Sequence, residues 1–534
     1  MRMRTGLLAL AMVLAAPAMA QEVMTRGRPS SVASFQEKSI DEQQAMMASG
    51  EQTSEQITEL YIERIRMLDQ NGPTLRSVIA VSPNAIEQAR ASDARRKAGR
   101  LRGPLDGIPV LIKDNIDTKE LPTTAGSLAL ADNRTNRDAP MVAQLRAQGA
   151  VILGKTNLSE WANIRSNHSM SGWSAVGGLV KNPYALDRTA CGSSSGSGAA
   201  VAASLAAVAV GTETDGSVVC PAAMTGLVGL KPTLGLVSRT HVVPISHSQD
   251  TPGPMARSVK DAAILFSAMV GSDPKDAATK GADKYRRDYA AGLSADALKG
   301  VRVGYWKPEM DEVLAARFDK ALDELRGAGA IPVEVKMPEL KGLGDAESEV
   351  LYTELKDDLA AYLASTPASE VRTLADVIKF NEANKAAEMP FFGQESFLKA
   401  EKTRGTKDAE YLGARAKSAR LAGVEGIDAM LKAADAQILV SPTYGTPWLS
   451  DPAHGDQFSG PSASELPAVS GYPHLTVPMG LVEGLPAGLS FIGTAYSDGL
   501  LLNAGYAYEQ ATHARVAPRY LPSVPADLGP RKVR

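Results

Sequence analysis

The stretch Cys191-Gly-Ser-Ser-Ser-Gly-Ser-Gly198, followed by an alanine-rich segment and then by Gly211-Thr-Glu-Thr-Asp-Gly-Ser217, is the most unusual part of this chain. The alanine-rich segment, residues 199–210, has the pattern of a helix. Flexible linkers can be rich in glycine and serine, but they do not normally lie between apolar elements in the middle of a domain. A phosphate-binding loop would end in Gly-Lys-Ser or Gly-Lys-Thr, whereas two alanines follow here. Both interpretations are therefore weak.

Two short catalytic motifs also match, and both matches are interpreted as accidental. Gly192-Ser-Ser-Ser-Gly196 fits the G-x-S-x-G nucleophile elbow, with Ser194 at its centre. That elbow follows directly on a buried strand, and residues 183–190 do not have the pattern of one. Ser396-Phe-Leu-Lys399 fits S-x-x-K, but it lies in a charged region without a recognisable S-D-N or K-T-G companion.

Short apolar strands alternate with helical patterns along the rest of the chain. Residues 108–112 and 151–153 are expected to be strands. Residues 301–306 and 331–335 flank a predicted amphipathic helix that ends at Gly327, and such a crossover joins parallel strands. Three further strands are expected at residues 438–440, 475–477 and 489–492. This pattern predicts the α/β class, with a mixed central β-sheet covered by helices on both faces.

The chain is expected to form a single large domain, because it shows no internal repeat and no long linker. Thr53 and Gln56 resemble a capping box at the start of a helix. The expected core spans about residues 53–300. A charged helical insertion is expected at about residues 341–434, and closing strands are expected at about residues 437–512. All of these elements belong to one expected domain of residues 21–534.

Composition excludes several classes of function. The 534 residues are 44% hydrophobic and 22% charged, which is typical of a soluble globular protein. A net charge of −3 disfavours nucleic acid and a polybasic membrane surface as partners, and 5% aromatic residues disfavour a base-stacking platform. Two cysteines and no HExxH motif exclude the common zinc sites. We therefore expect an enzyme or binding protein without metal or cofactor; no pattern indicates an oligomeric state.

The N-terminus has the layout of a secretory signal peptide. Arg2 and Arg4 form a basic region, residues 6–16 are an apolar stretch too short to span a bilayer, and Ala18-Met-Ala20 is an A-x-A cleavage site. We expect cleavage after Ala20, so that residues 1–20 are removed and the mature protein is periplasmic or secreted. The alternative is a buried N-terminal helix.

Several ordered blocks resemble the amidase signature family. The similarity spans nearly all of the mature chain, from Thr53 to Thr512. The blocks are residues 107–115, 154–161, 192–198, 211–233 and the closing pair 471–478 and 484–489. A single glycine- and serine-rich loop would be a weak signal, whereas ordered blocks at this spacing are highly specific.

The resemblance implies a Ser–Ser–Lys triad. By motif position the nucleophile is Ser217, the bridging residue is Ser193 and the base is Lys113. The chemistry is self-consistent, because a serine hydroxyl needs a positioned base and a lysine can serve only when it is uncharged. Lys113 directly follows the apolar residues 108–112, where burial would favour the uncharged amine. The alternative is an exposed lysine at the end of a strand.

The same resemblance implies an oxyanion site in the second block. Backbone N–H groups of Thr214, Asp215, Gly216 and Ser217 can converge on the developing oxygen anion. Many family members have glycine where this chain has Asp215. A carboxylate beside an oxyanion would oppose catalysis, so we expect the Asp215 side chain to point away from these amides.

The variant Thr-Glu-Thr-Asp-Gly-Ser resembles most closely the exported peptide amidases of the family. The implied reaction converts the C-terminal amide of a small or short-peptide substrate to acid and ammonia, through an acyl-enzyme. Alternatives are a general acylamide or aryl-acylamide hydrolase, a cyclic-amide hydrolase, the glutaminase subunit of a tRNA-dependent amidotransferase, or a non-catalytic binding protein. The signal peptide argues against the amidotransferase subunit. Trp161 and Trp173 could line the substrate channel or pack in the core.

The two cysteines lie close to the implied triad in the sequence. Cys191 precedes Ser193 by two residues and Cys220 follows Ser217 by three. If the triad forms, their backbones approach, and an exported protein could oxidise them. Proximity does not determine side-chain orientation, and we expect two buried free thiols.

Overall fold

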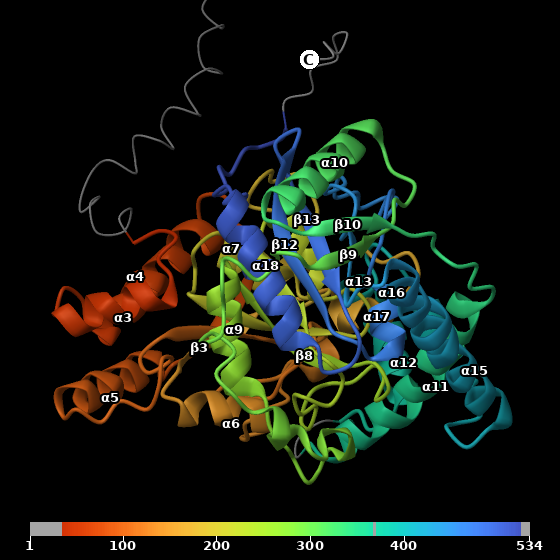
Figure 1. Ribbon diagram of the computed structural model, residues 1–534. Coiled ribbons are helices and arrows are strands. Elements are labelled where there is room, and N and C mark those ends of the chain that lie inside the picture. Colours follow the sequence, from red (N-terminus) through yellow and green to blue (C-terminus); the bar gives the residue numbers. More distant parts are fainter. Residues whose placement is uncertain (1–34, 367–369, 525–534) are drawn as a thin grey trace, which may run out of the picture.

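The computed structural model describes residues 35–366 and 370–524 (Figure 1). The predicted signal peptide lies outside the described residues. The main feature is one mixed sheet of 11 strands in the order β1-β3-β2-β6-β8-β7-β12-β13-β11-β9-β10. Its strands are β1 (Val78–Val81), β2 (Pro109–Lys113), β3 (Val151–Thr156), β6 (Val208–Glu213), β7 (Val228–Lys231), β8 (Thr251–Ala256), β9 (Arg302–Tyr305), β10 (Ile331–Glu334), β11 (Ile438–Pro442), β12 (His474–Val482) and β13 (Leu485–Ile492). The short strands β4 (Trp173–Ser174) and β5 (Gly178–Leu179) pair separately.

Two groups of parallel strands flank an antiparallel centre. Strand β2 pairs in parallel with both β3 and β6, and β9 pairs in parallel with both β10 and β11. The strands between these groups are antiparallel. Strands β2, β3 and β6 are buried along their whole length, which explains why they are nearly continuous apolar runs rather than alternating patterns.

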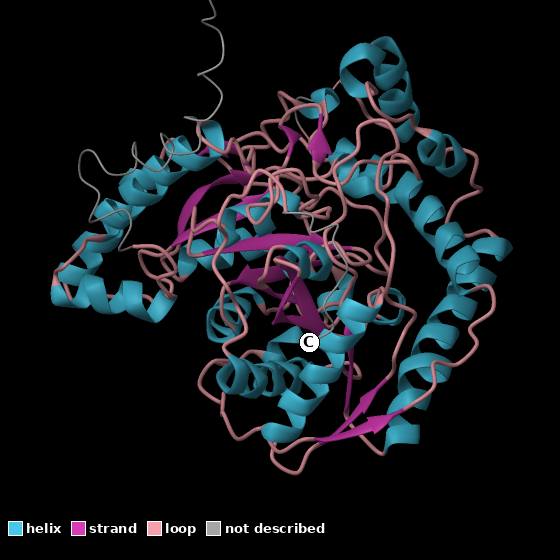
Figure 2. Cartoon of the chain, turned by 90° about the horizontal axis from the view of Figure 1, so that it is seen from above, coloured by secondary structure: helices cyan, strands magenta, loops and turns pink. Residues whose placement is uncertain are grey.

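Helices cover both faces of the sheet, as Figure 2 shows from above. One group packs against β8, β12 and neighbouring helices: α6 (Pro140–Ala147), α9 (Val259–Met269), α10 (Glu312–Gly327) and α18 (Asp498–Thr512). On the other face, α7 (Ser195–Ala202) and α8 (Val219–Met224) pack against β6, β7 and β13. The expected α/β class and its mixed, doubly covered sheet are therefore confirmed.

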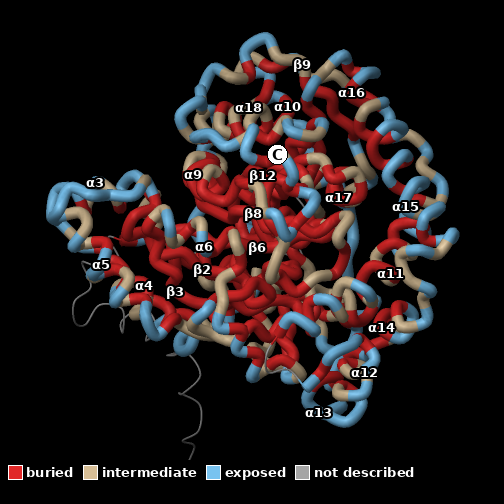
Figure 3. Tube along the Cα trace, turned by 90° about the horizontal axis from the view of Figure 1, so that it is seen from below, coloured by how far each residue is buried: buried red, intermediate tan, exposed pale blue. Residues whose placement is uncertain are grey.

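The strands are the most deeply buried part of the chain, and helices at the periphery expose one side (Figure 3). Near the N-terminal end lie α3 (Ile40–Ser49), α4 (Ser54–Arg64) and α5 (Ala85–Lys97). Thr53 caps α4 together with Gln56 in the expected capping box. The described residues between 343 and 434 are mostly in helices: α11 (Leu343–Ala364), α12 (Leu374–Ala383), α13 (Lys385–Glu388), α14 (Glu395–Ala400), α15 (Ala409–Ala422) and α16 (Ala429–Ala434). They lie along one side of the molecule, and α17 (Glu465–Ser470) packs against α15.

The helix expected over residues 199–210 is wrong in its second half. Helix α7 runs from Ser195 to Ala202, and residues 208–213 form the buried strand β6. Val208 and Val210 each pair with β2, so tertiary pairing and β-branched side chains override the helical pattern of the alanines. The difference matters because the chain enters the block 211–217 from a strand instead of from a helix.

Candidate active site

Lys113 is the last residue of β2 and is completely buried. Its Nζ lies 2.7 Å from Oγ of Ser193, 2.9 Å from Oγ1 of Thr212 and 3.1 Å from the Thr212 carbonyl oxygen. The parallel pairing of β2 with β6 sets this arrangement, because it brings the ends of the two strands together. Lys113 is therefore buried rather than exposed at a strand end.

Burial lowers the pKa of Lys113 to about 7, while the more distant carboxyls of Asp250 and Glu213 act in the opposite direction. Within the described residues Lys113 forms no ion pair. Lys155 on the adjacent strand β3 differs from Lys113 in this respect. It is also buried, but its Nζ lies 2.8 Å from a carboxylate oxygen of Asp114. Near neutral pH a substantial fraction of Lys113 is therefore an uncharged amine, which can accept a proton.

Ser193 lies in a loop that leads into α7, and the Gly192–Ser193 peptide bond is cis. The next residue ties this loop to the two other segments of the site. Ser194 donates its backbone N–H to the Ser217 carbonyl oxygen at 3.1 Å, and its Oγ donates to the Thr212 carbonyl oxygen at 3.1 Å. Lys113, Ser193 and the loop that carries Ser217 therefore lie side by side.

Residues 214–218 form a loop between β6 and α8. Glu213 closes this loop, because its Oε2 accepts hydrogen bonds from the backbone N–H groups of Val218 at 2.7 Å and Val219 at 2.9 Å. None of the turn and loop backbone hydrogen bonds in the described part of the chain uses the N–H groups of residues 214–217 as donors. These amides are thus available to an external acceptor.

Gly216 lies in the left-handed region, with φ of +74°, and a Cβ there would overlap the hydroxyl of Tyr444 and lie 3.1 Å from Oγ of Ser464. Replacing Gly216 with alanine is therefore expected to displace the loop and to lower kcat/KM for an amide substrate by about 100-fold or more. Steady-state kinetics of a correctly folded variant would test this.

The matched control is the double variant Gly216→Ala/Tyr444→Phe, which removes the overlapping hydroxyl and should recover part of the lost activity. A Gly216→Ala enzyme with wild-type kcat/KM would contradict the assigned role of this glycine.

The Asp215 side chain lies beside the hydroxyl of Ser464, and burial raises its pKa. Its charge also raises the pKa of two neighbouring carboxyls, Glu347 on α11 and Glu465 on α17, although burial is the larger cause in both. Oδ1 of Asp215 is shielded from solvent and has no hydrogen-bond partner. The expected direction of this carboxylate relative to the loop amides stays a prediction.

Trp161 and Trp173 are both buried in apolar clusters. Trp161 contacts Phe397 edge-to-face, with ring centroids 5.9 Å apart. Trp173 packs in the same manner against Phe392 at 5.4 Å, and the guanidinium of Arg165 lies 5.7 Å from its ring centroid. These contacts correspond to the core-packing alternative, and they also join the 343–434 segment to the rest of the molecule, through Phe397 on α14 and Phe392 before it.

Sequence reasoning missed three residues that shape this site. Thr212 accepts from Lys113, Asn115 donates its Nδ2 to Oγ1 of Thr212 at 2.9 Å, and Glu213 closes the loop described above. All three lie within the sequence blocks 107–115 and 211–217, so the signal was present, but hydrogen-bond partners could not be assigned without the strand pairing.

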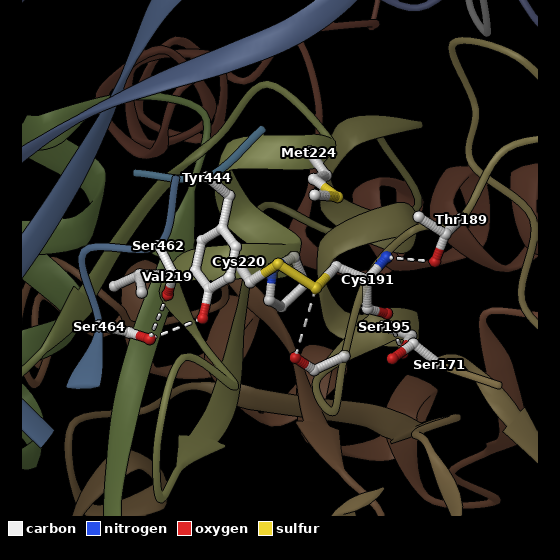
Figure 4. The surroundings of a disulfide bond; sticks show 12 residues. Ser171, Thr189, Cys191, Ser195, Val219, Cys220, Met224, Tyr444, Ser462 and Ser464 are labelled. Atoms are coloured by element: carbon white, nitrogen blue, oxygen red, sulfur yellow. Dashed lines mark hydrogen bonds between the residues drawn. A yellow bond between two sulfur atoms is a disulfide. The ribbon is translucent and has the colours of Figure 1, made fainter. Parts of the chain in front are cut away.

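Cys191 and Cys220 form a disulfide bond, which Figure 4 shows beside Met224 and Tyr444. The expectation of two free thiols is wrong. Cys191 adopts a left-handed conformation with φ of +56°, and Cys220 lies in the first turn of α8, so that their Cα atoms are 6.0 Å apart. This separation is within the range that a disulfide spans. The bond links the start of the loop that carries Ser193 to the first turn of α8, directly after the loop that carries Ser217.

Removing this disulfide is expected to lower the free energy of unfolding by about 3–4 kcal/mol, because it closes a loop between cysteines 29 residues apart. Denaturant unfolding of the Cys191→Ala/Cys220→Ala variant would measure the loss. Treating the wild-type protein with a reductant should lower its free energy of unfolding by a similar amount. An unchanged unfolding midpoint in the variant would contradict the expectation.

One group of side chains in the described residues has the geometry of a metal site. The potential ligand atoms of His247, Glu354 and Asp358 lie within 4.8 Å of one another. The Glu354 oxygens, however, already accept hydrogen bonds from the hydroxyls of Tyr411 at 2.6 Å and Ser248 at 2.9 Å. The group therefore acts as a structural link between α11 and the loop that precedes β8.

Known proteins that are similar to this chain indicate its family. The amidase family model matches residues 56–502. A probable amidase of Arabidopsis thaliana is 40% identical over 506 residues, which are 92% of this chain and 94% of the relative. A glutamyl-tRNA(Gln) amidotransferase subunit of Pseudomonas syringae pv. syringae is 36% identical over 86% of this chain and 94% of the relative. The solved structure of the native peptide amidase from Stenotrophomonas maltophilia is 48% identical, with a TM-score of 0.87 over 91% of this chain and 99% of that one.

The fold and these relatives define an enzyme that hydrolyses amide bonds. The chain belongs to the amidase family, and the resemblance to the amidase signature family is confirmed. In the described parts of the chain, no helix has both the length and the apolar character needed to cross a bilayer.

Proposed function

We propose that this enzyme hydrolyses the C-terminal carboxamide of peptides to the free acid and ammonia. In this proposal Ser217 is the nucleophile, Ser193 relays its proton and Lys113 is the base. The observation that carries the proposal is the 2.7 Å contact between Oγ of Ser193 and the buried Nζ of Lys113, which has no carboxylate partner within the described residues.

The first half of the reaction forms an acyl-enzyme. The uncharged amine of Lys113 accepts the proton of Ser193, which in turn accepts the proton of Ser217. Oγ of Ser217 then attacks the carbonyl carbon of the substrate. The negative charge that develops on the carbonyl oxygen is stabilised by backbone N–H groups of residues 214–217.

The second half restores the enzyme. The proton held by Lys113 returns through Ser193 to the leaving nitrogen, which departs as ammonia. A water molecule then attacks the ester of Ser217 and gives up a proton along the same route, so that the acid is released and Ser217 regains its hydroxyl. Each of these proton transfers uses the 2.7 Å hydrogen bond between Nζ of Lys113 and Oγ of Ser193.

Similarity to the peptide amidase supports a peptide amide as the substrate. That protein has also been solved with the competitive inhibitor chymostatin, at 48% identity to this chain and a TM-score of 0.87. The amidotransferase subunit is less similar, at 36% identity. A peptide amide is therefore favoured over glutamine bound to a transfer complex.

Ammonia release tests the proposal. Purified protein is incubated separately with an amidated dipeptide, glutamine, acetamide and an anilide, with the Ser217→Ala protein as the control. The proposal expects rapid release from the amidated dipeptide and little from the others. Release from acetamide or the anilide at a similar rate would instead indicate a general acylamide or aryl-acylamide hydrolase. No release from any amide would favour a binding protein.

We also propose that the mature enzyme is exported and begins at Gln21. The basic, apolar and A-x-A order of residues 1–20 supports export, and so does the Cys191–Cys220 disulfide, since such bonds persist in oxidising compartments. N-terminal sequencing of the protein from a periplasmic or culture fraction is expected to begin at Gln21. Retention of Met1 would contradict export by this route.

A further inference from the structure

Two consecutive residues just before β8, Gln249 and Asp250, contact the first residue of the loop that carries Ser217. Nε2 of Gln249 donates a hydrogen bond to the Thr214 carbonyl oxygen at 3.3 Å. Oδ1 of Asp250 accepts a hydrogen bond from the Thr214 hydroxyl at 2.6 Å. Thr214 is therefore held through both its backbone and its side chain.

The two residues that hold the loop are themselves fixed by buried hydrogen bonds. Gln249 is only 2% exposed, and its Nε2 also donates to Oε1 of Glu347 on α11 at 2.8 Å. A carbonyl oxygen can only accept, so Gln249 must present its amide nitrogen to the loop. The second carboxylate oxygen of Asp250 accepts from the backbone N–H groups of Ile245 at 2.8 Å and Ser246 at 2.9 Å. The loop is thus attached to a network that is already in place.

The hydrogen bond from Gln249 determines the orientation of one peptide group. The peptide bond between Thr214 and Asp215 is trans, so its C=O and N–H point in opposite directions. Because Gln249 holds the C=O, the N–H of Asp215 points to the other side of the loop. Within the described residues this N–H donates to no backbone atom in a turn or loop and to no side chain. It is one of the N–H groups proposed above to stabilise the oxyanion.

We infer that Gln249 is a positioning residue, which keeps the N–H of Asp215 directed at the carbonyl oxygen that becomes negatively charged during the reaction. The hydrogen bond between Asp250 and the Thr214 hydroxyl is the second support of the same peptide group. The inference rests on the proposed function, since it concerns the oxyanion of that reaction. A peptide group turned the other way would present its carbonyl oxygen to the oxyanion and would oppose catalysis.

Gln249→Met tests this role, because it keeps the length of the side chain and removes the donor. We expect kcat for an amidated dipeptide to fall about 30-fold while KM stays within about twofold, since the lost stabilisation belongs to the transition state. A peptide aldehyde forms a tetrahedral adduct with a serine hydroxyl, and its inhibition constant should rise by the same factor. Calorimetric titration with the amidated dipeptide should give the same affinity for Ser217→Ala and Ser217→Ala/Gln249→Met. An unchanged kcat, or an equal loss of affinity for the amide and the aldehyde, would overturn the inference.

Thr214→Val tests the second support independently and decides the question if Gln249→Met does not fold. It removes the hydroxyl and keeps the shape of the side chain, so we expect about a tenfold loss in kcat and in aldehyde affinity. Thr214→Ser, which restores the hydroxyl, should recover most of this loss. The matched control is Ser248→Ala in the same turn, because the Ser248 hydroxyl donates to Oε2 of Glu354 at 2.9 Å and not to the loop. Its kcat should stay within about twofold of wild type. A loss in Ser248→Ala as large as in Gln249→Met would overturn the assignment, and so would a Thr214→Val enzyme with wild-type kcat.

The same measurements separate this inference from the proposed function. If wild-type enzyme hydrolyses the amidated dipeptide and Gln249→Met does so with the same kcat, the proposed function holds and the inference fails. If wild-type enzyme hydrolyses no amide but binds the aldehyde about 30-fold more tightly than Gln249→Met, the positioning role holds and the proposed reaction fails. An enzyme that neither hydrolyses the amide nor binds the aldehyde would contradict both.

Discussion

Replacing Lys113 with alanine is expected to lower kcat by about 10⁴-fold or more while leaving the protein folded. The proposed base is the only group within hydrogen-bond distance of Ser193 Oγ in the described residues that loses its charge near neutral pH. Without it, the proton of Ser217 has no acceptor along this path. Ammonia release from an amidated dipeptide measures the loss, and circular dichroism confirms the fold.

The informative control is Lys113→Arg, which keeps a hydrogen-bond donor at this position but cannot become uncharged. It should be as inactive as the alanine variant if Lys113 acts as a base. Activity within about tenfold of wild type in the arginine variant would instead indicate that Lys113 only positions Ser193.

Replacing Ser217 with alanine is the second change with a very large expected effect, again about 10⁴-fold or more in kcat. Ser217 is the only residue that the proposal acylates, so its loss removes the intermediate as well as the rate. Mass spectrometry of the wild-type enzyme quenched during turnover should detect an acyl group on the peptide that contains Ser217, and the variant should show none.

The neighbouring Ser194 provides the matched control. It lies in the same loop as Ser193, but its hydroxyl donates to the Thr212 carbonyl oxygen instead of contacting Lys113. Ser194→Ala is expected to cost about tenfold in kcat or less, through positioning alone. An acyl group found on Ser194, or a Ser217→Ala enzyme with more than about 1% of wild-type activity, would contradict the assignment of the nucleophile.

Much of the fold could be predicted because its signals are local. The strands β9 and β10 and their crossover helix α10 follow from periodicity over a few dozen residues, and their parallel pairing is as expected. Lys113 could be placed at the end of a buried strand for the same reason. Strand β8 could not be predicted, because its sequence, Thr-Pro-Gly-Pro-Met-Ala, is unusual for a strand. Pairing with β6 and β7 stabilises it as a strand in the folded chain.

The parts of the site that could not be predicted depend on contacts between distant residues. The Cys191–Cys220 disulfide requires two side-chain directions, and a left-handed backbone at Cys191 sets one of them. The carboxyls of Asp215, Glu347 and Glu465 are all more than a hundred positions apart in the sequence, and they affect one another's pKa only in the folded chain. Sequence blocks predict which residues carry the chemistry, whereas contacts between side chains that are distant in the sequence depend on how the folded chain packs.

The most direct test of the central claim measures the reactivity of Ser217 itself as a function of pH. The claim is that an uncharged Lys113 activates Ser217 through Ser193. Burial lowers the pKa of Lys113 to about 7, so the amine is protonated and unable to accept a proton below that pH and is free to accept one above it. Labelling of wild-type enzyme by a fluorophosphonate, followed by peptide mass spectrometry, is expected to modify Ser217 at a rate that rises with pH through a midpoint near 7, and to be abolished in Lys113→Met. A rate that does not change around neutral pH, or a Lys113→Met enzyme labelled as fast as wild type, would contradict the account.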